Sequence, residues 1–211
     1  VSGKVTLDGR PLLWKNRDTD FMRNHVDYVK GERYDFIAVV NSANAYLKEA
    51  WMGTNSAGFA LMNTQSYNLV DVKGDEERGA ANGRVIYRAL EVCATVEDFC
   101  HFLDTISKPS DIEANFGVID AQGGAAMFEV DYYKYVMYDA NNPKDAPYGY
   151  IARTNFSFAG KVNEGAGYVR YMEADQVLMK ASATGNITPQ FIFNDLSRSF
   201  RNRMLDIDLR S

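Results

Sequence analysis

The chain has 211 residues, a formal net charge of −5, 46% hydrophobic residues and 24% charged residues. This length suits one domain, and the composition is that of an ordinary globular protein rather than a disordered one. The negative charge argues against nucleic acid as a partner, because such a surface must present basic residues to the phosphates. The longest apolar run, 36–40, is too short for the ~20 residues of a membrane span. We therefore expect a single domain over residues 1–211, without a membrane span.

Turn signals divide the first 64 residues into pairs of short strands. Asp8-Gly9 fits a type I′ turn, because both central residues of that turn need a positive φ. Loops at 30–32 and 55–58 contain glycine and favour two further hairpins. The expected strand pairs are 4–7 with 11–15, 24–29 with 34–40, and 50–53 with 59–64.

Helical periodicity follows a polar loop at about 71–82. Ile86, Ala89 and Cys93 lie on one stripe of a first helix. Thr95 and Asp98 then have the spacing of a capping box, which predicts the start of a second helix. Two helices in succession are therefore expected between the early hairpins and the next group of strands.

The second half of the chain repeats this order of strands followed by helices. A helix is expected over about 165–182, and Thr188-Pro189 opens another with proline at its first position. The expected strands before them are 115–120, 125–130, 133–138 and 148–154.

The order of elements predicts an α+β fold. Strands joined by hairpins form antiparallel sheets, and helices grouped in pairs can cover one face of each sheet. Two such sheets packed together would give a four-layer αββα sandwich with mainly antiparallel strands.

Cysteine and histidine are scarce, with two of each. Cys93 and Cys100 are seven residues apart in helical sequence, which favours buried core thiols over a disulfide framework. His25 and His101 have no metal-ligand spacing, so we expect no metal and no cofactor.

Several stretches, in matching order, resemble the cysteine N-terminal-nucleophile (Ntn) hydrolases of the choloylglycine hydrolase and acyl-CoA:6-aminopenicillanate acyltransferase-like kind. That family's first strand ends in Arg-Asn-x-Asp or Gln-Asn-x-Asp, and a later turn reads Gly-x-Asn-x-x-Gly. Residues 8 to 170 contain all the matches. The matching stretches are Lys15-Asn16-Arg17-Asp18, 53–63, 115–120, 126–130, Arg153-Thr154-Asn155 and 167–170.

The resemblance implies the αββα sandwich and an amide hydrolase whose nucleophile is the first residue of the mature chain. That cysteine is expected a few residues upstream of Val1, because Cys93 and Cys100 lie in helical sequence. We therefore expect the given chain to be incomplete at both ends. Export to the periplasm or the medium is favoured if a leader precedes Val1.

Five residues match functional positions of the family. Asp18 matches the aspartate that holds the cysteine and its amine, and Lys15 stands where bile salt hydrolases carry a catalytic arginine. Asn63 and Asn155 match strand-end asparagines that offer donors to an oxyanion, and Arg170 matches an arginine that braces the site. Each also has an ordinary structural interpretation, as a turn residue, a solvated strand lysine or a helix-surface arginine.

The resemblance predicts hydrolysis, or acyl transfer, at a linear carbon–nitrogen amide bond of a small-molecule N-acyl amide. An alternative is a non-catalytic binding protein that keeps the fold and has lost the nucleophile. A metal-dependent hydrolase is disfavoured by the scarcity of histidine. A homo-oligomer is compatible with the sequence, which does not reveal the acyl or the amine group.

Overall fold

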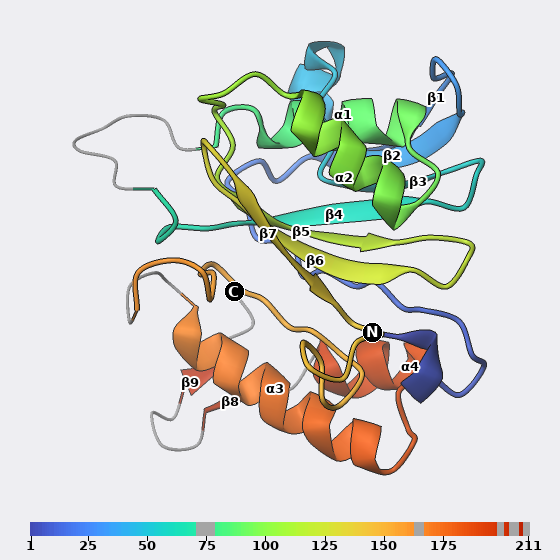
Figure 1. Cartoon of the computed structure of the whole chain (residues 1–211), viewed down its shortest axis with the longest axis vertical. Coiled ribbons are helices and arrows are strands. Elements are labelled where there is room, and N and C mark those ends of the chain that lie inside the picture. Colours follow the sequence, from blue (N-terminus) through green and yellow to red (C-terminus); the bar gives the residue numbers. More distant parts are fainter. Residues whose placement is uncertain (71–78, 163–166, 198–200, 203–206, 209–211) are drawn as a thin grey trace.

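The computed structural model describes residues 1–70, 79–162, 167–197, 201–202 and 207–208 (Figure 1). One seven-stranded sheet dominates it, and every neighbouring pair of strands is antiparallel and adjacent in the chain. The strands of this main sheet are β1 (Asn24–Val29), β2 (Phe36–Asn41), β3 (Met52–Asn55), β4 (Ala60–Gln65), β5 (Ala114–Ile119), β6 (Ala125–Val130) and β7 (Tyr135–Asp139).

Helices lie on both sides of the main sheet (Figure 1). The pair α1 (Asn82–Val92) and α2 (Val96–Thr105) covers one face, and α3 (Tyr168–Ala183) with the short α4 (Pro189–Phe191) lies on the other side. Within the described residues, no helix is both long and apolar enough to cross a membrane. The minor elements are η1 (Gly3–Val5), η2 (Ser42–Leu47), a π-helical turn η3 (Ile192–Leu196), β8 (Arg201–Asn202) and β9 (Ile207–Asp208).

Local signals account for most of these boundaries. The capping box is confirmed: the Thr95 side chain accepts from the Asp98 backbone N–H, and the Asp98 side chain accepts from the Thr95 backbone N–H. Pro189 occupies the first turn of α4, where it costs no helical hydrogen bond. Gly9 has a φ of 75°, but Asp8 lacks the positive φ of a type I′ turn, so the expected turn type at Asp8-Gly9 is wrong. The start of the expected helix at 165–182, and positions 71–78 of the expected polar loop, lie outside the described residues.

The main core lies between the sheet and the α1–α2 layer. Phe99 of α2 is fully buried and contacts three other buried rings edge-on or tilted, those of Phe59, Phe116 and Phe128. A smaller core surrounds α3, where Leu178 packs with residues of the turn after α4. The helical stripes seen in the sequence therefore mark the faces that the sheet buries.

Three expected strands are wrong, those at 4–7, 11–15 and 148–154. Residues 11–15 join no ladder, and the Leu12 N–H donates to the Val1 carbonyl. The segment 4–7 forms a 3₁₀ turn and an isolated bridge at Thr6, because Ser2 caps that turn. Segment 148–154 belongs to no ladder: it begins in a turn, where Gly149 has a φ of 71°, and the side chains of Thr64 and Asn115 bind its Thr154 carbonyl. The expected second sheet is therefore not confirmed in the described residues. Residues 11–19 and 150–157, which form no strand, lie between the main sheet and α3 (Figure 1).

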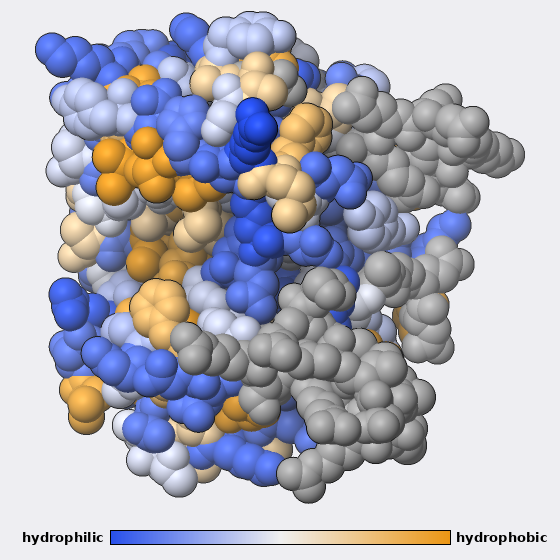
Figure 2. All heavy atoms as spheres, turned by 180° about the vertical axis from the view of Figure 1, so that it is seen from behind, coloured by the Kyte–Doolittle hydropathy of each residue, from blue (hydrophilic) through white to orange (hydrophobic). Residues whose placement is uncertain are grey.

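The sheet face opposite α1 and α2 is only partly covered. Strand alternation places Ile37 on this face, because its neighbours Phe36 and Ala38 are buried under the helices. Tyr28 and Ile37 are register partners, and together with Val26 they are exposed. Seen from behind, hydrophobic side chains gather between the two helical layers (Figure 2).

We expect Phe99→Ala to lower the free energy of unfolding by about 3–5 kcal/mol, because it leaves a cavity among four packed rings. Phe193→Ala is the control, since Phe193 is 66% exposed and should change stability by less than about 0.5 kcal/mol. Urea denaturation followed by circular dichroism measures both. Equal effects of the two substitutions would contradict this account of the core.

Candidate active site

A cavity of about 340 Å³ lies between the main sheet and the layer formed by the N-terminal segment, residues 151–155 and α3. Its walls are chemically divided. Apolar side chains of β5, β6 and α3 line one part, and charged and amide side chains line the other. The cavity wall includes all five residues that the sequence singles out, which are Lys15, Asp18, Asn63, Asn155 and Arg170.

Lys15 enters the cavity wall from the extended N-terminal segment. Its Nζ donates to Asn63 Oδ1 at 3.0 Å and to the Trp51 carbonyl at 3.2 Å. Burial, with a smaller contribution from the charge of Arg17, lowers the pKa of Lys15 to about 7. Lys15 therefore changes charge near neutral pH, which an arginine at this position would not do.

Register places Asn63 on the sheet face that α1 and α2 cover, although its side chain also lines the cavity. In the sheet it pairs with Phe116, whose side chain lies in the core under α2. Its Oδ1 is occupied by Lys15. Within the described part of the chain its Nδ2 has no protein acceptor, so this amide group remains a donor.

Asn155 and Arg170 form one unit. Arg170 Nη2 donates to Asn155 Oδ1 at 2.7 Å, and Asn155 Nδ2 donates to the Gln65 carbonyl at 3.0 Å. The second hydrogen of Nδ2 has only a 3.4 Å contact with Thr64 Oγ1. The Asn155 amide is therefore anchored to both α3 and β4.

The start of α3 is tied to the same segment through Gly167. Thr154 Oγ1 donates to the Gly167 carbonyl at 2.8 Å. Gly167 has a φ of 91°, and a Cβ there would lie 2.9 Å from Thr154 Oγ1. A glycine is needed at this position both for the backbone conformation and for the close approach, which brings Arg170 within reach of Asn155.

Asp18 differs from the other four in having a free side chain. It is exposed at the cavity wall. No described residue donates a hydrogen bond to its carboxylate or forms an ion pair with it. Asp18 is therefore available to bind an ammonium or another donor that enters the cavity.

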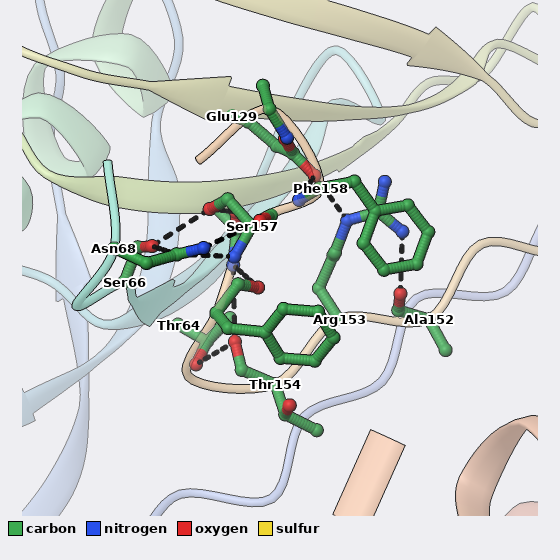
Figure 3. Close-up of polar contacts among 12 residues, drawn as sticks. Thr64, Ser66, Asn68, Glu129, Ala152, Arg153, Thr154, Ser157 and Phe158 are labelled. Atoms are coloured by element: carbon green, nitrogen blue, oxygen red, sulfur yellow. Dashed lines mark hydrogen bonds and ion pairs between the residues drawn. The ribbon is translucent and has the colours of Figure 1, made fainter. Parts of the chain in front are cut away.

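Segment 152–159 is held by buried polar side chains that sequence reasoning missed (Figure 3). Register places Thr64, Asn115 and Glu129 side by side across β4, β5 and β6. This polar row binds the segment: Thr64 and Asn115 donate to the Thr154 carbonyl, and Glu129 accepts from the backbone N–H groups of 158 and 159. A signal exists in the sequence, since Asn115 and Glu129 are polar residues within apolar strands.

Glu129 also forms a buried ion pair with Arg153, whose side chain is 3% exposed. The Arg153 guanidinium lies over the Phe158 ring at 3.8 Å and over the Tyr138 ring at 4.8 Å. The ion pair, two backbone N–H donors to Glu129 and two rings against Arg153 offset the cost of burying both charges. This pair fastens β6 to the cavity wall.

Both cysteines lie away from the cavity. Cys93 is buried in the main core, where burial raises the pKa of its thiol to about 12. Cys100 packs against the same core, and burial raises its thiol pKa as well. The described residues that line the cavity include no cysteine and no histidine. The interpretation of both cysteines as core thiols therefore agrees with their positions.

Residues 6–192 match the model of the acyl-coenzyme A:6-aminopenicillanic acid acyl-transferase family. This match covers most of the chain. The chain belongs to that family. The resemblance in the stretches from Lys15 to Arg170 is thereby confirmed. A search of the curated proteins found no match.

Several solved structures are similar to this chain at low sequence identity. A mutant conjugated bile acid hydrolase from Clostridium perfringens matches with 13% identity and a TM-score of 0.47, over 83% of this chain and 67% of that one. Penicillin V acylase from Agrobacterium tumefaciens matches with 18% identity and a TM-score of 0.39, over 77% of this chain and 62% of that one. The chain thus spans about two thirds of the length of these proteins.

The lowered pKa of Lys15 predicts a pH-dependent stability. Its pKa is about 7 in the folded protein and 10.5 in the unfolded chain, so between these values the unfolded state binds more protons. Raising the pH from 7 to 10 therefore stabilises the protein relative to Lys15→Met, by up to about 1.4 kcal/mol per pH unit.

Urea denaturation of both proteins at several pH values measures this difference. Lys144→Met is the matched control, because Lys144 is an exposed lysine. A difference between the native protein and Lys15→Met that does not change with pH would show that Lys15 is not buried as described.

Proposed function

We propose that the protein cleaves a linear carbon–nitrogen amide bond of a small-molecule N-acyl amide, by hydrolysis or acyl transfer, through an N-terminal cysteine that precedes Val1. The observation that carries this proposal is the convergence of five residues, drawn from positions 15 to 170, on one cavity. Family membership supports the acyl chemistry. The positions of both cysteines, away from that cavity, support a nucleophile outside the given chain.

The position of Val1 supports the same proposal, since Val1 lines the cavity with Asp18 and Asn155. A cysteine a few residues upstream can reach the cavity on a short strand. The α-amine of this cysteine takes the thiol proton as the sulfur attacks the amide carbonyl. The α-ammonium passes the proton to the nitrogen of the scissile bond, and the substrate's amine leaves. Water or a second amine then attacks the thioester and releases the acyl group from the cysteine.

In this proposal the free carboxylate of Asp18 orients the α-amine. Lys15 lies beside Asn63 and contributes a positive charge that favours the thiolate. Asn155 and Asn63 supply side-chain N–H donors to the oxyanion, and each such donor is worth about 2.7–4 kcal/mol in comparable enzymes. Arg170 holds the Asn155 carbonyl oxygen, which turns the amide nitrogen away from α3.

The four-layer αββα sandwich belongs to the same proposal. The extended segments at 11–19 and 150–157 lie where a second sheet would stack on the main sheet, and α3 lies beyond them. In the proposed sandwich these segments form the layer between the main sheet and α3, without the ladder of a regular sheet.

The proposal is tested with the full-length protein, including its residues upstream of Val1, on a panel of N-acyl 4-nitroanilides. We expect iodoacetamide to abolish cleavage, whereas Cys93→Ala and Cys100→Ser retain it, because their thiols lie outside the cavity. Asp18→Asn should lower kcat/KM by about 100-fold, through the loss of the anion that orients the amine.

Asp20→Asn is the matched control for Asp18→Asn, because Asp20 is exposed two residues away and does not line the cavity. One residue added ahead of the cysteine should abolish turnover, since an amide nitrogen cannot accept the proton. Full activity with a blocked N-terminus would refute the mechanism. Binding of the anilides without cleavage by the native protein would instead favour the non-catalytic alternative.

A further inference from the structure

The direction of the Asn155 side chain is not set by regular secondary structure. Residues 151–158 belong to no strand or helix. A residue in such a segment takes its φ and ψ from whatever holds the peptide groups on either side of it. The contacts of the peptide groups before Asn155 and after Phe156 therefore restrict where the Asn155 amide points.

Asn115 holds the peptide group before Asn155 and the one after Phe156, so its two contacts span these two residues. Its Nδ2 donates to the Thr154 carbonyl at 3.1 Å and to the Phe156 carbonyl at 3.0 Å. Its Oδ1 accepts from Ser157 Oγ at 2.5 Å. Asn115 is fully buried on β5, so both of its N–H groups and its carbonyl are used within the protein.

The position of Asn115 in the sheet is equally constrained. It is the middle member of the polar row, with Thr64 on one side and Glu129 on the other. Thr64 makes contact with Asn155 itself, and Glu129 holds the segment three and four residues further on. Of the three residues of the polar row, Asn115 is the one whose Nδ2 binds a carbonyl before Asn155 and a carbonyl after it.

We propose that Asn115 is a positioning residue for the amide-cleaving site, because its side-chain amide clamps the carbonyls before and after Asn155 and so holds the Asn155 amide, one of whose hydrogens makes only a 3.4 Å contact, at the cavity wall. This inference rests on the proposed function. Asn115 does not line the cavity, and it acts only through Asn155. Its loss should weaken transition-state stabilisation more than substrate binding.

Asn68 offers a matched comparison. It is also a buried asparagine, 3% exposed, and its Nδ2 also donates to two backbone carbonyls, those of Ser157 and Lys161. It therefore holds the same stretch of chain with the same type of contact, but beyond Asn155. A general loss of stability should affect Asn68 and Asn115 variants alike.

The proposal is tested by the kinetics of Asn115→Ala and Asn68→Ala. The substrate is the N-acyl 4-nitroanilide that the native protein cleaves fastest. We expect Asn115→Ala to lower kcat by 10- to 100-fold with KM changed less than about threefold. Asn68→Ala should keep kcat within about threefold at a comparable loss of thermal stability. Asn115→Ser, which keeps one hydroxyl donor, should fall between Asn115→Ala and the native protein and serves if the alanine variant does not fold.

A second measurement separates this proposal from the proposed function. The side-chain amide resonance of Asn155, assigned through Asn155→Asp, should shift in ¹H–¹⁵N spectra of the folded Asn115 variants and stay in place in Asn68→Ala. If the native protein cleaves none of the anilides, the proposed function fails and the spectra alone decide. Equal kcat losses in the Asn115 and Asn68 variants, or an unshifted Asn155 resonance, would overturn the positioning role.

Discussion

Segment 152–159 lies on the main sheet without joining its backbone ladder, and much of the site depends on how its peptide groups are satisfied. Buried N–H and C=O groups without partners are costly, so the sheet must supply them from side chains. The polar row of Thr64, Asn115 and Glu129 does this from three adjacent strands. Because these strands are fixed by their ladder, the segment takes up a fixed position, and Asn155 with it.

The same arrangement explains the division of the molecule into two faces. Under α1 and α2 the sheet packs a hydrophobic core around Phe99, which provides the stability on which the other face relies. On the opposite face the sheet carries buried amides and an ion pair between Glu129 and Arg153, which are expensive to bury. A rigid apolar layer on one side allows polar groups to be held in place on the other.

The electrostatics of the cavity follow from partial burial. Lys15 and Arg17 approach the site from one strand-like segment, and Arg170 approaches from α3. Arg170 is bound to Asn155, while Lys15 is buried beside Arg17 and has a lowered pKa. Among the described residues that line the cavity, Asp18 has an exposed carboxylate without a protein partner. The three charged side chains therefore have different tasks. Arg170 braces the Asn155 amide, Lys15 has a pKa near neutral pH, and Asp18 is free to bind an amine.

Much of the secondary structure could be predicted from the sequence, because it depends on local effects. Glycine turns, the Thr95–Asp98 box and the 3.6-residue stripes of α1 and α2 act over a few residues. The candidate site residues also came from sequence, as motif matches, with Lys15 and Asn155 far apart in the chain. Only the tertiary structure decided that they share one cavity, that 148–154 is not a strand, and that Asn115 clamps Asn155. These outcomes depend on register between distant strands, and no local pattern encodes which side chain will lie opposite another.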